Sequence, residues 1–189
     1  MDLGTPPLFS LINLKRKAHF RNSKQVMHIK NCYHLLIWRG KLLFRFNDGK
    51  PFPYLINQRT KFIKKLTTYI FLGEFENKNV FLWDMSDSHD VLGNTGQIGS
   101  FNDADRNYHP DLPTGTYFCD LRNLLPVLNS KYANLCATAK GMYEWHKRVN
   151  FCQSCGGKLS SEKAGWEKTC TKCNLKQFPR IDPVVIMLI

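Results

Sequence analysis

Two pairs of closely spaced cysteines limit what this chain can fold into more than any other feature. The first pair is Cys152 and Cys155, the second is Cys170 and Cys173, and fourteen residues separate them. A CxxC turn aims two sulfur atoms at one point, and Zn²⁺ prefers a tetrahedron of thiolates at about 2.3 Å. Gly156, directly after the first pair, permits the tight backbone turn that such a site needs. The spacing therefore predicts a zinc ribbon.

The predicted role of this metal is structural. Four thiolates fill the coordination sphere and leave no position for a water molecule or substrate. The spacer is long enough for a short hairpin, with Trp166 available to cover its face. Two disulfides or an iron–sulfur centre are the alternative uses of the same four cysteines. The remaining cysteines, Cys32, Cys119 and Cys136, have no second cysteine near them in the sequence and are expected to be buried thiols.

The composition predicts a folded chain with a basic surface. Of its 189 residues 43% are hydrophobic and 13% aromatic, which is enough for an apolar core. The formal net charge is +12, and no acidic residue occurs between Leu3 and Asn47. This stretch is interpreted either as a solvated basic face or as a binding face for a polyanion such as a nucleotide or nucleic acid.

The region before the ribbon is predicted to form mostly antiparallel sheet. Residues 32–46 read as a hairpin with Gly40 in the connection, and 67–75 pair with 80–84 across a polar turn. Residues 86–113 are rich in Ser, Asp, Asn, Gly and Pro, which is typical of a long irregular segment. No internal repeat is visible.

A helix is predicted to link this sheet to the ribbon. Asn129 or Ser130 can cap its start, and Lys147 and Arg148 suit its negative C-terminal end. Apolar side chains recur with helical spacing and form the face expected to pack on the sheet: Tyr132, Leu135, Cys136, Ala139, Met142 and Tyr143.

Six consecutive apolar residues, 184–189, follow the ribbon and read as a strand covered on both faces. We therefore expect an α+β chain with four parts. An N-terminal antiparallel sheet domain spans 1–119, a helical connector 120–149, the zinc ribbon 150–177, and residues 178–189 begin a further domain whose other strands are missing from this chain.

The motifs FCQSCG at 151–156 and FPRIDP at 178–183, with the second CxxC between them and Trp145-His146 before them, resemble the NADH pyrophosphatases of the Nudix superfamily. The resemblance is loose over the whole chain and specific over 145–189. It implies a Nudix-like N-terminal domain, a zinc ribbon and the first strand of a truncated Nudix domain. It also implies a dimeric, cytosolic enzyme that splits NADH or NAD⁺ into a nicotinamide mononucleotide and AMP, or removes NAD caps from RNA.

The same family carries a catalytic signature, Gx5Ex7REUxEExGU, whose glutamates hold Mg²⁺ or Mn²⁺. This sequence contains no such glutamate cluster. Glu74-Phe75-Glu76 comes nearest, and it is interpreted as a strand end. No catalytic residue is assigned, and the 189-residue chain is expected to be inactive alone. The resemblance places Phe178 near the nucleotide pocket, where it would stack on a base or nicotinamide ring; packing between the ribbon and a catalytic domain is the alternative.

Two further functions remain open at this stage: a basic zinc-ribbon protein that binds nucleic acid or acts as an adaptor, and a regulatory subunit that dimerises with an intact relative. No apolar run reaches the roughly 18 residues of a membrane span, and residues 1–12 lack the pattern of a secretory signal. Cytoplasm is therefore the expected location. An organelle transit peptide is the alternative, although Pro6 and Pro7 weaken the helix that it would form.

Overall fold

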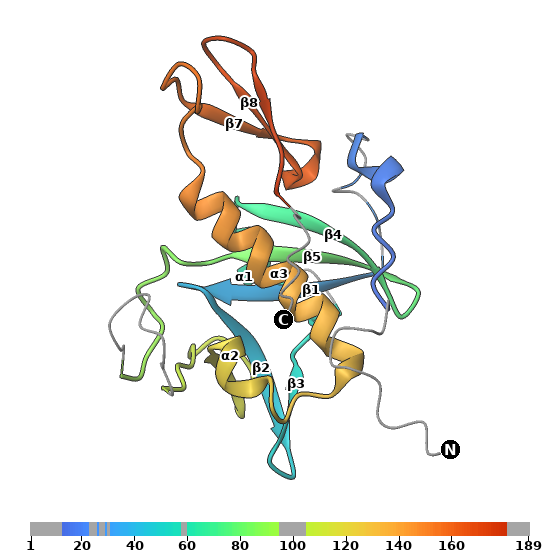
Figure 1. The fold of residues 1–189 in the computed structure, drawn as a ribbon. Helices are drawn as coiled ribbons and strands as arrows, with labels where there is room; N and C mark the ends of the chain where they lie inside the picture. Colours follow the sequence, from blue (N-terminus) through green and yellow to red (C-terminus); the bar gives the residue numbers. More distant parts are fainter. Residues whose placement is uncertain are drawn as a thin grey trace, which may run out of the picture.

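The computed structural model describes residues 13–22, 26, 29, 31–57, 60–94 and 105–180 (Figure 1). Its elements follow one another as η1 Ala18–Asn22, β1 Cys32–Trp38, β2 Lys41–Asn47, β3 Lys50–Pro53, α1 Lys61–Lys64, β4 Tyr69–Phe75, β5 Lys78–Asp84, β6 Thr116–Cys119, α2 Leu121–Leu124, α3 Ser130–Arg148, β7 Leu159–Glu162, η3 Lys163–Gly165, β8 Glu167–Cys170 and β9 Lys176–Gln177.

The first six strands form one mixed sheet, in the order β3-β2-β1-β5-β4, with β6 paired to β2. Both predicted hairpins are present: β1 pairs antiparallel with β2, and β4 with β5. Strand β1, however, pairs in parallel with β5, so the sheet is mixed and not antiparallel throughout. Turn residues specify a hairpin locally, whereas the pairing between hairpins depends on the path of the crossover. The α+β class is confirmed.

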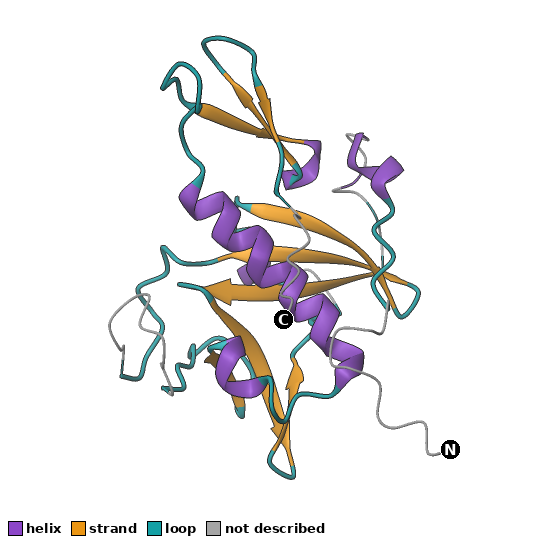
Figure 2. Cartoon of the chain, in the orientation of Figure 1, coloured by secondary structure: helices purple, strands orange, loops and turns teal. Residues whose placement is uncertain are grey.

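Side chains on both faces of this sheet are buried. In β1, Leu35 and Ile37 join the core under α3, while Leu36 and Trp38 join a second core on the opposite face. That second core includes Ile63 of α1, and the picture shows α3 crossing the other face (Figure 2). Because neither face is exposed to water, the strands lack the apolar–polar alternation of a half-exposed sheet.

Helix α3 has the predicted start and the predicted buried face. The Asn129 side chain accepts a hydrogen bond from the backbone N–H of Lys131, which caps the first turn. All the apolar positions named above are buried except Tyr132, which is half-buried. At the other end the buried Lys168 of the ribbon donates to the carbonyls of His146 and Val149. The ribbon thus supplies the cation that the helix C-terminus favours.

The ribbon is a three-stranded sheet, β7-β8-β9, beside the C-terminal end of α3 (Figure 1). The sequence predicted that Trp166 could cover the face of its own hairpin, but the structure buries it in the core of the large sheet under α3. Its Nε1–H donates to the carbonyl of Phe71 in β4 at 2.5 Å, and the guanidinium of Arg21 lies 3.7 Å from its ring centroid. A Cβ added at Gly165 would come within 3.0 Å of Ile70, so this glycine permits the close approach. Trp166 therefore fastens the ribbon to the large sheet.

Two further sequence predictions concern the C-terminal strand and the segment 86–113. The apolar strand at 184–189 lies outside the described residues. The described parts of 86–113 are irregular, as expected, and contain only isolated bridges, from Leu92 to Tyr108 and from Asn107 to Phe118 of β6. Strand β6, just after this segment, has no counterpart in the sequence-based expectation. Among the described helices, none combines the length and apolarity that crossing a bilayer requires.

Candidate metal centre and adjoining groove

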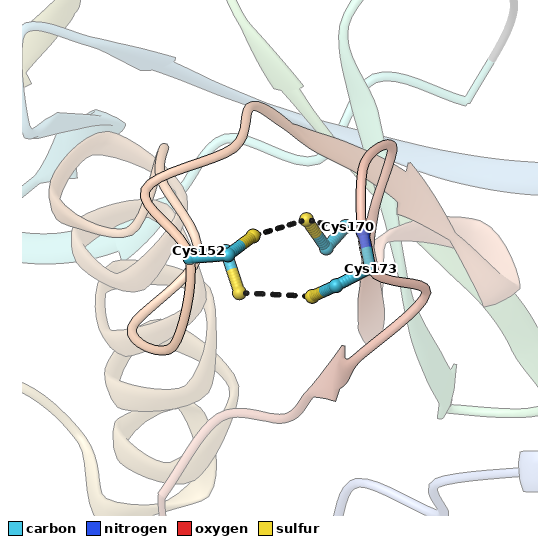
Figure 3. A group of neighbouring side chains, drawn as sticks. Cys152, Cys170 and Cys173 are labelled. Carbon is cyan, nitrogen blue, oxygen red and sulfur yellow. Dashed lines mark hydrogen bonds between the residues drawn. The ribbon is translucent and has the colours of Figure 1, made fainter.

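The four predicted cysteines meet at one point. Their sulfur atoms all lie within 4.8 Å of one another, with Cys152 Sγ 3.6 Å from Cys173 Sγ and Cys155 Sγ 3.5 Å from Cys170 Sγ. Figure 3 shows Cys152 on one loop facing Cys170 and Cys173 on another. Four thiolates at about 2.3 Å from one metal ion would be about 3.8 Å apart. The arrangement therefore matches a tetrahedral site in size.

Two loops with the same hydrogen-bond pattern present the sulfurs. In the first, the N–H of Cys152 donates to the Gly157 carbonyl and the N–H of Gly156 donates back to Cys152. In the second, Cys170 donates to Leu175 and Asn174 donates back to Cys170. The fifth residue of each loop has positive φ, +68° at Gly156 and +59° at Asn174. Glycine and asparagine tolerate this conformation best, so the sequence prescribes both turns.

Gly157 allows the backbone to approach the sulfurs closely. A Cβ at this position would lie 2.9 Å from Cys170 Sγ and 3.4 Å from Cys155 Sγ. Any larger residue would displace at least one sulfur from the shared centre. The glycine pair after Cys155 thus serves both the turn and the packing around the metal centre.

Backbone amides favour thiolate at two of the four positions. The N–H groups of Cys173 and Lys172 lie 3.4 Å from Cys170 Sγ and lower the pKa of Cys170 to about 6. The pKa of Cys152 is lowered chiefly by the N–H of Cys155. At Cys173 the N–H of Leu175 acts in the same direction, but the neighbouring cysteine side chains prevail and raise the pKa to about 12.

Sulfurs packed this closely cannot all ionise unless a cation joins them. The four cysteines could bind a metal ion such as Zn²⁺, and their donor set fits it: soft sulfur ligands, a tetrahedral spacing and no position left for water. Within the described part of the chain, no other group of three or more His, Cys, Asp or Glu side chains is placed to hold a metal.

The remaining sequence-based assignments can be compared with their positions. None of the seven cysteines is in a disulfide, and all lie in described regions. Cys32, Cys119 and Cys136 are buried as predicted, and burial raises the pKa of Cys136 far above its usual range. The Glu74 carboxylate, near the end of β4, forms ion pairs with Lys15 and Lys17 at 3.2 and 3.1 Å. These contacts agree with the interpretation of Glu74 as part of a strand end.

A groove of about 760 Å³ lies between α3, the end of the ribbon and the segment around Arg16. Phe178 lines it and is 57% exposed, so this ring is available for contact. The indoles of Trp145 and Trp166 form further aromatic walls, and the exposed Arg16 and Arg180 also line the groove. The sequence singled out Phe178 and left the other walls unassigned, because α3, the ribbon and the N-terminal segment meet only in the folded chain.

Nothing in the sequence indicated that Gln177 would lie in this groove. Gln177, the last residue of β9, is 8% exposed, and neither its Nε2 nor its Oε1 has a hydrogen-bond partner among the residues that the structure describes. Buried amides without partners are uncommon because each unmade bond costs free energy. Only the neighbouring FPR motif in the sequence marked this stretch as functional.

Comparison with known protein families places this architecture. A family profile described as "NADH pyrophosphatase-like rudimentary NUDIX domain" matches residues 32–145, which span the large sheet and most of α3. The match ends before the ribbon, so the cysteine cluster is an independent observation.

Three curated relatives match shorter stretches. Nudix hydrolase 19, chloroplastic, of Arabidopsis thaliana is 42% identical over 57 residues, covering 29% of this chain and 13% of that protein. The NAD-capped RNA hydrolase NUDT12 of Homo sapiens is 32% identical over 87 residues, covering 42% and 17%. The NAD(P)H pyrophosphatase NUDT13, mitochondrial, of Homo sapiens is 30% identical over 96 residues, covering 50% and 27%. The matches thus span less than a third of each relative.

Proposed function

Since the chain belongs to the family of NADH pyrophosphatase-like rudimentary NUDIX domains, we propose that it is the N-terminal and zinc-ribbon part of an NAD(H) diphosphatase. The observation that carries the proposal is the joint occurrence of three features in one chain. A sheet that matches this family is followed by four converging cysteines and then by the FPRIDP motif at 178–183. The names of NUDT12 and NUDT13 support NAD-capped RNA or NAD(P)H as the substrate class.

The proposed reaction is hydrolysis of a pyrophosphate. Water adds to one phosphorus of NADH or NAD⁺, the bridging P–O bond breaks, and nicotinamide mononucleotide and AMP leave. A pyrophosphate needs its charge neutralised by Mg²⁺ or Mn²⁺, which carboxylate oxygens hold. This sequence has no REUxEE cluster to hold them. We therefore propose that the 189-residue chain does not catalyse the reaction by itself.

In the complete enzyme this part would support the catalytic domain. Zn²⁺ on the four cysteines would fix the ribbon, and Phe178 would stack on a ring of the substrate. We keep the division into 1–119, 120–149, 150–177 and 178–189 as the proposed domain organisation, and a homodimer as the proposed assembly. Cytoplasm is the proposed location, although two relatives are named chloroplastic and mitochondrial.

The test compares two lengths of the protein. Transcript sequence beyond the codon for Ile189 is expected to encode the signature Gx5Ex7REUxEExGU. The longer product should release AMP from NADH with Mg²⁺ or Mn²⁺, and the 189-residue chain should release none. AMP release by the purified short chain, or a transcript with no such frame, would contradict the proposal.

A nucleic-acid-binding ribbon is the second candidate, and its charges support it less well. Several ribbon and helix cations have partners inside the chain: Lys168 on α3 carbonyls, Lys176 with Glu167 at 2.9 Å, and Lys147 with Asp84 at 3.1 Å. Salt-dependent RNA binding by this chain, weakened by substituting exposed lysines such as Lys158 and Lys172, would favour it.

A further inference from the structure

The four cysteines of the ribbon combine close sulfur contacts with unequal exposure. Cys173 is exposed and Cys155 is half-buried, whereas Cys152 and Cys170 are buried. The Cys152 sulfur lies 3.6 Å from that of Cys173, and the Cys170 sulfur lies 3.5 Å from that of Cys155. Each of these contacts therefore joins an accessible sulfur on one loop to a buried sulfur on the other.

Coordination of a metal ion would keep these sulfurs in a reactive form. A cysteine that binds a metal ion is a thiolate, and the thiolate is the form that a peroxide oxidises. An oxidant from solvent meets Cys173 first, because Cys173 is the exposed member of the cluster. The sulfenic acid formed there lies beside Cys152, whose thiolate can displace the oxygen. The same two steps can follow at Cys155 and Cys170.

We propose that the cluster is an oxidation site at which peroxide exchanges the metal ion for two disulfides between the loops, Cys152–Cys173 and Cys155–Cys170. In each pair the accessible thiolate attacks one peroxide oxygen, the O–O bond breaks and hydroxide leaves. The partner thiolate then attacks the sulfur of the sulfenic acid, an S–S bond forms and a second hydroxide leaves. Each disulfide thus reduces one peroxide by two electrons, and the metal ion leaves because its ligands are consumed.

The alternative product is a disulfide within each CxxC loop, and the fold disfavours it. Hydrogen bonds already close each loop, such as the one from the Cys152 N–H to the Gly157 carbonyl. The pairs between the loops are 21 and 15 positions apart in the sequence. A crosslink restricts the unfolded chain more when it closes a longer loop, and thiol–disulfide exchange selects the more stable pairing. Bridges between the loops also replace the link that a bound metal ion supplies.

The ribbon should therefore stay packed on the sheet after it has lost its metal. Its contacts with the rest of the chain include two that do not involve the cysteines. Trp166 donates to the Phe71 carbonyl, and Lys168 donates to the carbonyls of His146 and Val149. Bridges that hold the loops together allow these contacts to persist. Metal removal without oxidation leaves the loops unlinked, and the amides of the ribbon should then lose their protection from exchange.

Oxidation of the zinc-loaded 189-residue chain tests the proposal. Hydrogen peroxide should release about one zinc ion per chain to a colorimetric chelator. The number of thiols titrated in denaturant should fall from seven to three. Those three are Cys32, Cys119 and Cys136, which are buried outside the cluster and serve as internal controls. A thiol reductant with added zinc should restore both values.

Peptide mapping identifies the bridges. A tryptic cut after Lys172 places Cys170 and Cys173 on separate peptides, whereas the cysteines of the first loop remain together on residues 149–158. Bridges between the loops therefore join three peptides into one species, and bridges within the loops leave 149–158 unlinked. Fragmentation of 149–158 between its two cysteines then assigns the partner of each.

Two double variants that each lose two cysteines provide the matched comparison. Cys152→Ser with Cys173→Ser leaves one pair between the loops, and Cys152→Ser with Cys155→Ser leaves one pair within a loop. Both should bind zinc far more weakly than the wild-type chain. After oxidation the first should recover amide protection in β7, β8 and β9, and the second should not. The reduced, chelator-treated wild-type chain is the reference for an unlinked ribbon.

Every result either supports or overturns the proposal. Zinc release, loss of four thiols, bridges between the loops and a protected ribbon support it. Zinc retention under excess peroxide, bridges within the loops, or sulfinic acids in place of disulfides overturns it. Loss of ribbon protection in the bridged protein also overturns it. None of these results depends on AMP release by the longer protein, so this proposal and the diphosphatase proposal fail separately.

Discussion

In the six-stranded sheet, large apolar side chains are buried on both faces, whereas β7 of the ribbon is mostly exposed along its length. The sheet holds together through two hydrophobic cores and α3. The ribbon contributes Trp166 to one core of the sheet, packs Ala164 against the other, and contacts α3 through Lys168 and through the Gly165 carbonyl, which bonds to His146. Its own strands are arranged around the four cysteines. A module of this size cannot bury enough apolar surface to fold unaided, and a structural metal is the usual remedy.

The candidate binding surface is the groove that Phe178 lines, and it lies where the sheet unit and the ribbon meet. The groove is bounded by a helix that belongs to the sheet and by strands that belong to the ribbon. Two units joined by the indole hydrogen bond from Trp166 to Phe71 thus define a cavity that neither could form alone. The experiments below test whether the two units are as different in their stabilisation as their packing indicates.

The largest expected effect comes from removing the metal. Cys170→Ser, at a fully buried ligand position, should reduce bound zinc from about one ion per chain to a small fraction. Structural zinc contributes roughly 10–16 kcal/mol in small zinc-dependent folds at neutral pH. Hydrogen exchange should show that the amides of β7, β8 and β9 lose protection while the large sheet keeps its protection. Ser154→Ala, in the same loop but not a ligand, is the control. Undiminished ribbon protection after complete zinc loss would contradict the comparison.

A cavity in the core of the sheet should destabilise the sheet and leave the zinc content of the ribbon unchanged. Leu35 is fully buried under α3, and Leu35→Ala should lower the free energy of unfolding by about 2–5 kcal/mol in urea titrations. Zinc content of the folded protein should remain unchanged. The matched control is Leu92→Ala, since Leu92 is 45% exposed. Release of zinc before the sheet unfolds would mean that the ribbon depends on this core directly.

Removing one indole hydrogen bond should loosen the contact between the two units. Trp166→Phe keeps an aromatic ring but leaves the Phe71 carbonyl without its donor, at an expected cost of about 1–3 kcal/mol. Faster amide exchange should appear in β4 and η3, with zinc retained. Trp38→Phe is the matched comparison, because the Trp38 indole donates to the Ser88 carbonyl at 3.1 Å, within the sheet unit. Equal exchange patterns in both variants would refute the anchoring role.

The smallest expected effect is a pH dependence of the free energy of unfolding, caused by His146 where α3 contacts the ribbon. Burial lowers the pKa of His146, and its hydrogen bond to the Gly165 carbonyl at 2.7 Å only partly opposes this. Below the ordinary histidine pKa of about 6.5 the unfolded chain therefore binds more protons than the folded one. Stability should fall as the pH drops from there to the lowered pKa, by roughly 1 kcal/mol or less.

His146→Gln should abolish the loss of stability that His146 causes at low pH. The test compares the free energy of unfolding as a function of pH for the wild-type protein and the variant. His89→Gln, the same substitution at an exposed position, is the control. A wild-type curve in His146→Gln would show that the buried ring does not titrate on unfolding.

Much of the local structure could be predicted because its causes are local. The hairpins follow from strand propensity and turn residues, and α3 follows from its apolar periodicity and the Asn129 cap. The parallel pairing of β1 with β5 and the addition of β6 to β2 could not be predicted. These pairings join segments far apart in the sequence, and no turn residue records them.

The sequence by itself determined that the four cysteines converge on one point. Two CxxC pairs, with Gly156 and Asn174 at the positions of positive φ, suffice to bring four sulfurs together because each loop directs its own pair. Only the tertiary structure decided what surrounds that centre. From the sequence alone, Trp166 could cover its own hairpin and Gln177 could face solvent. In the structure the ribbon packs on β4 and α3. The contact between the ribbon and the sheet buries the indole against Phe71 and leaves the Gln177 amide, within the described part of the chain, without a hydrogen-bond partner. Burial depends on which distant surfaces meet.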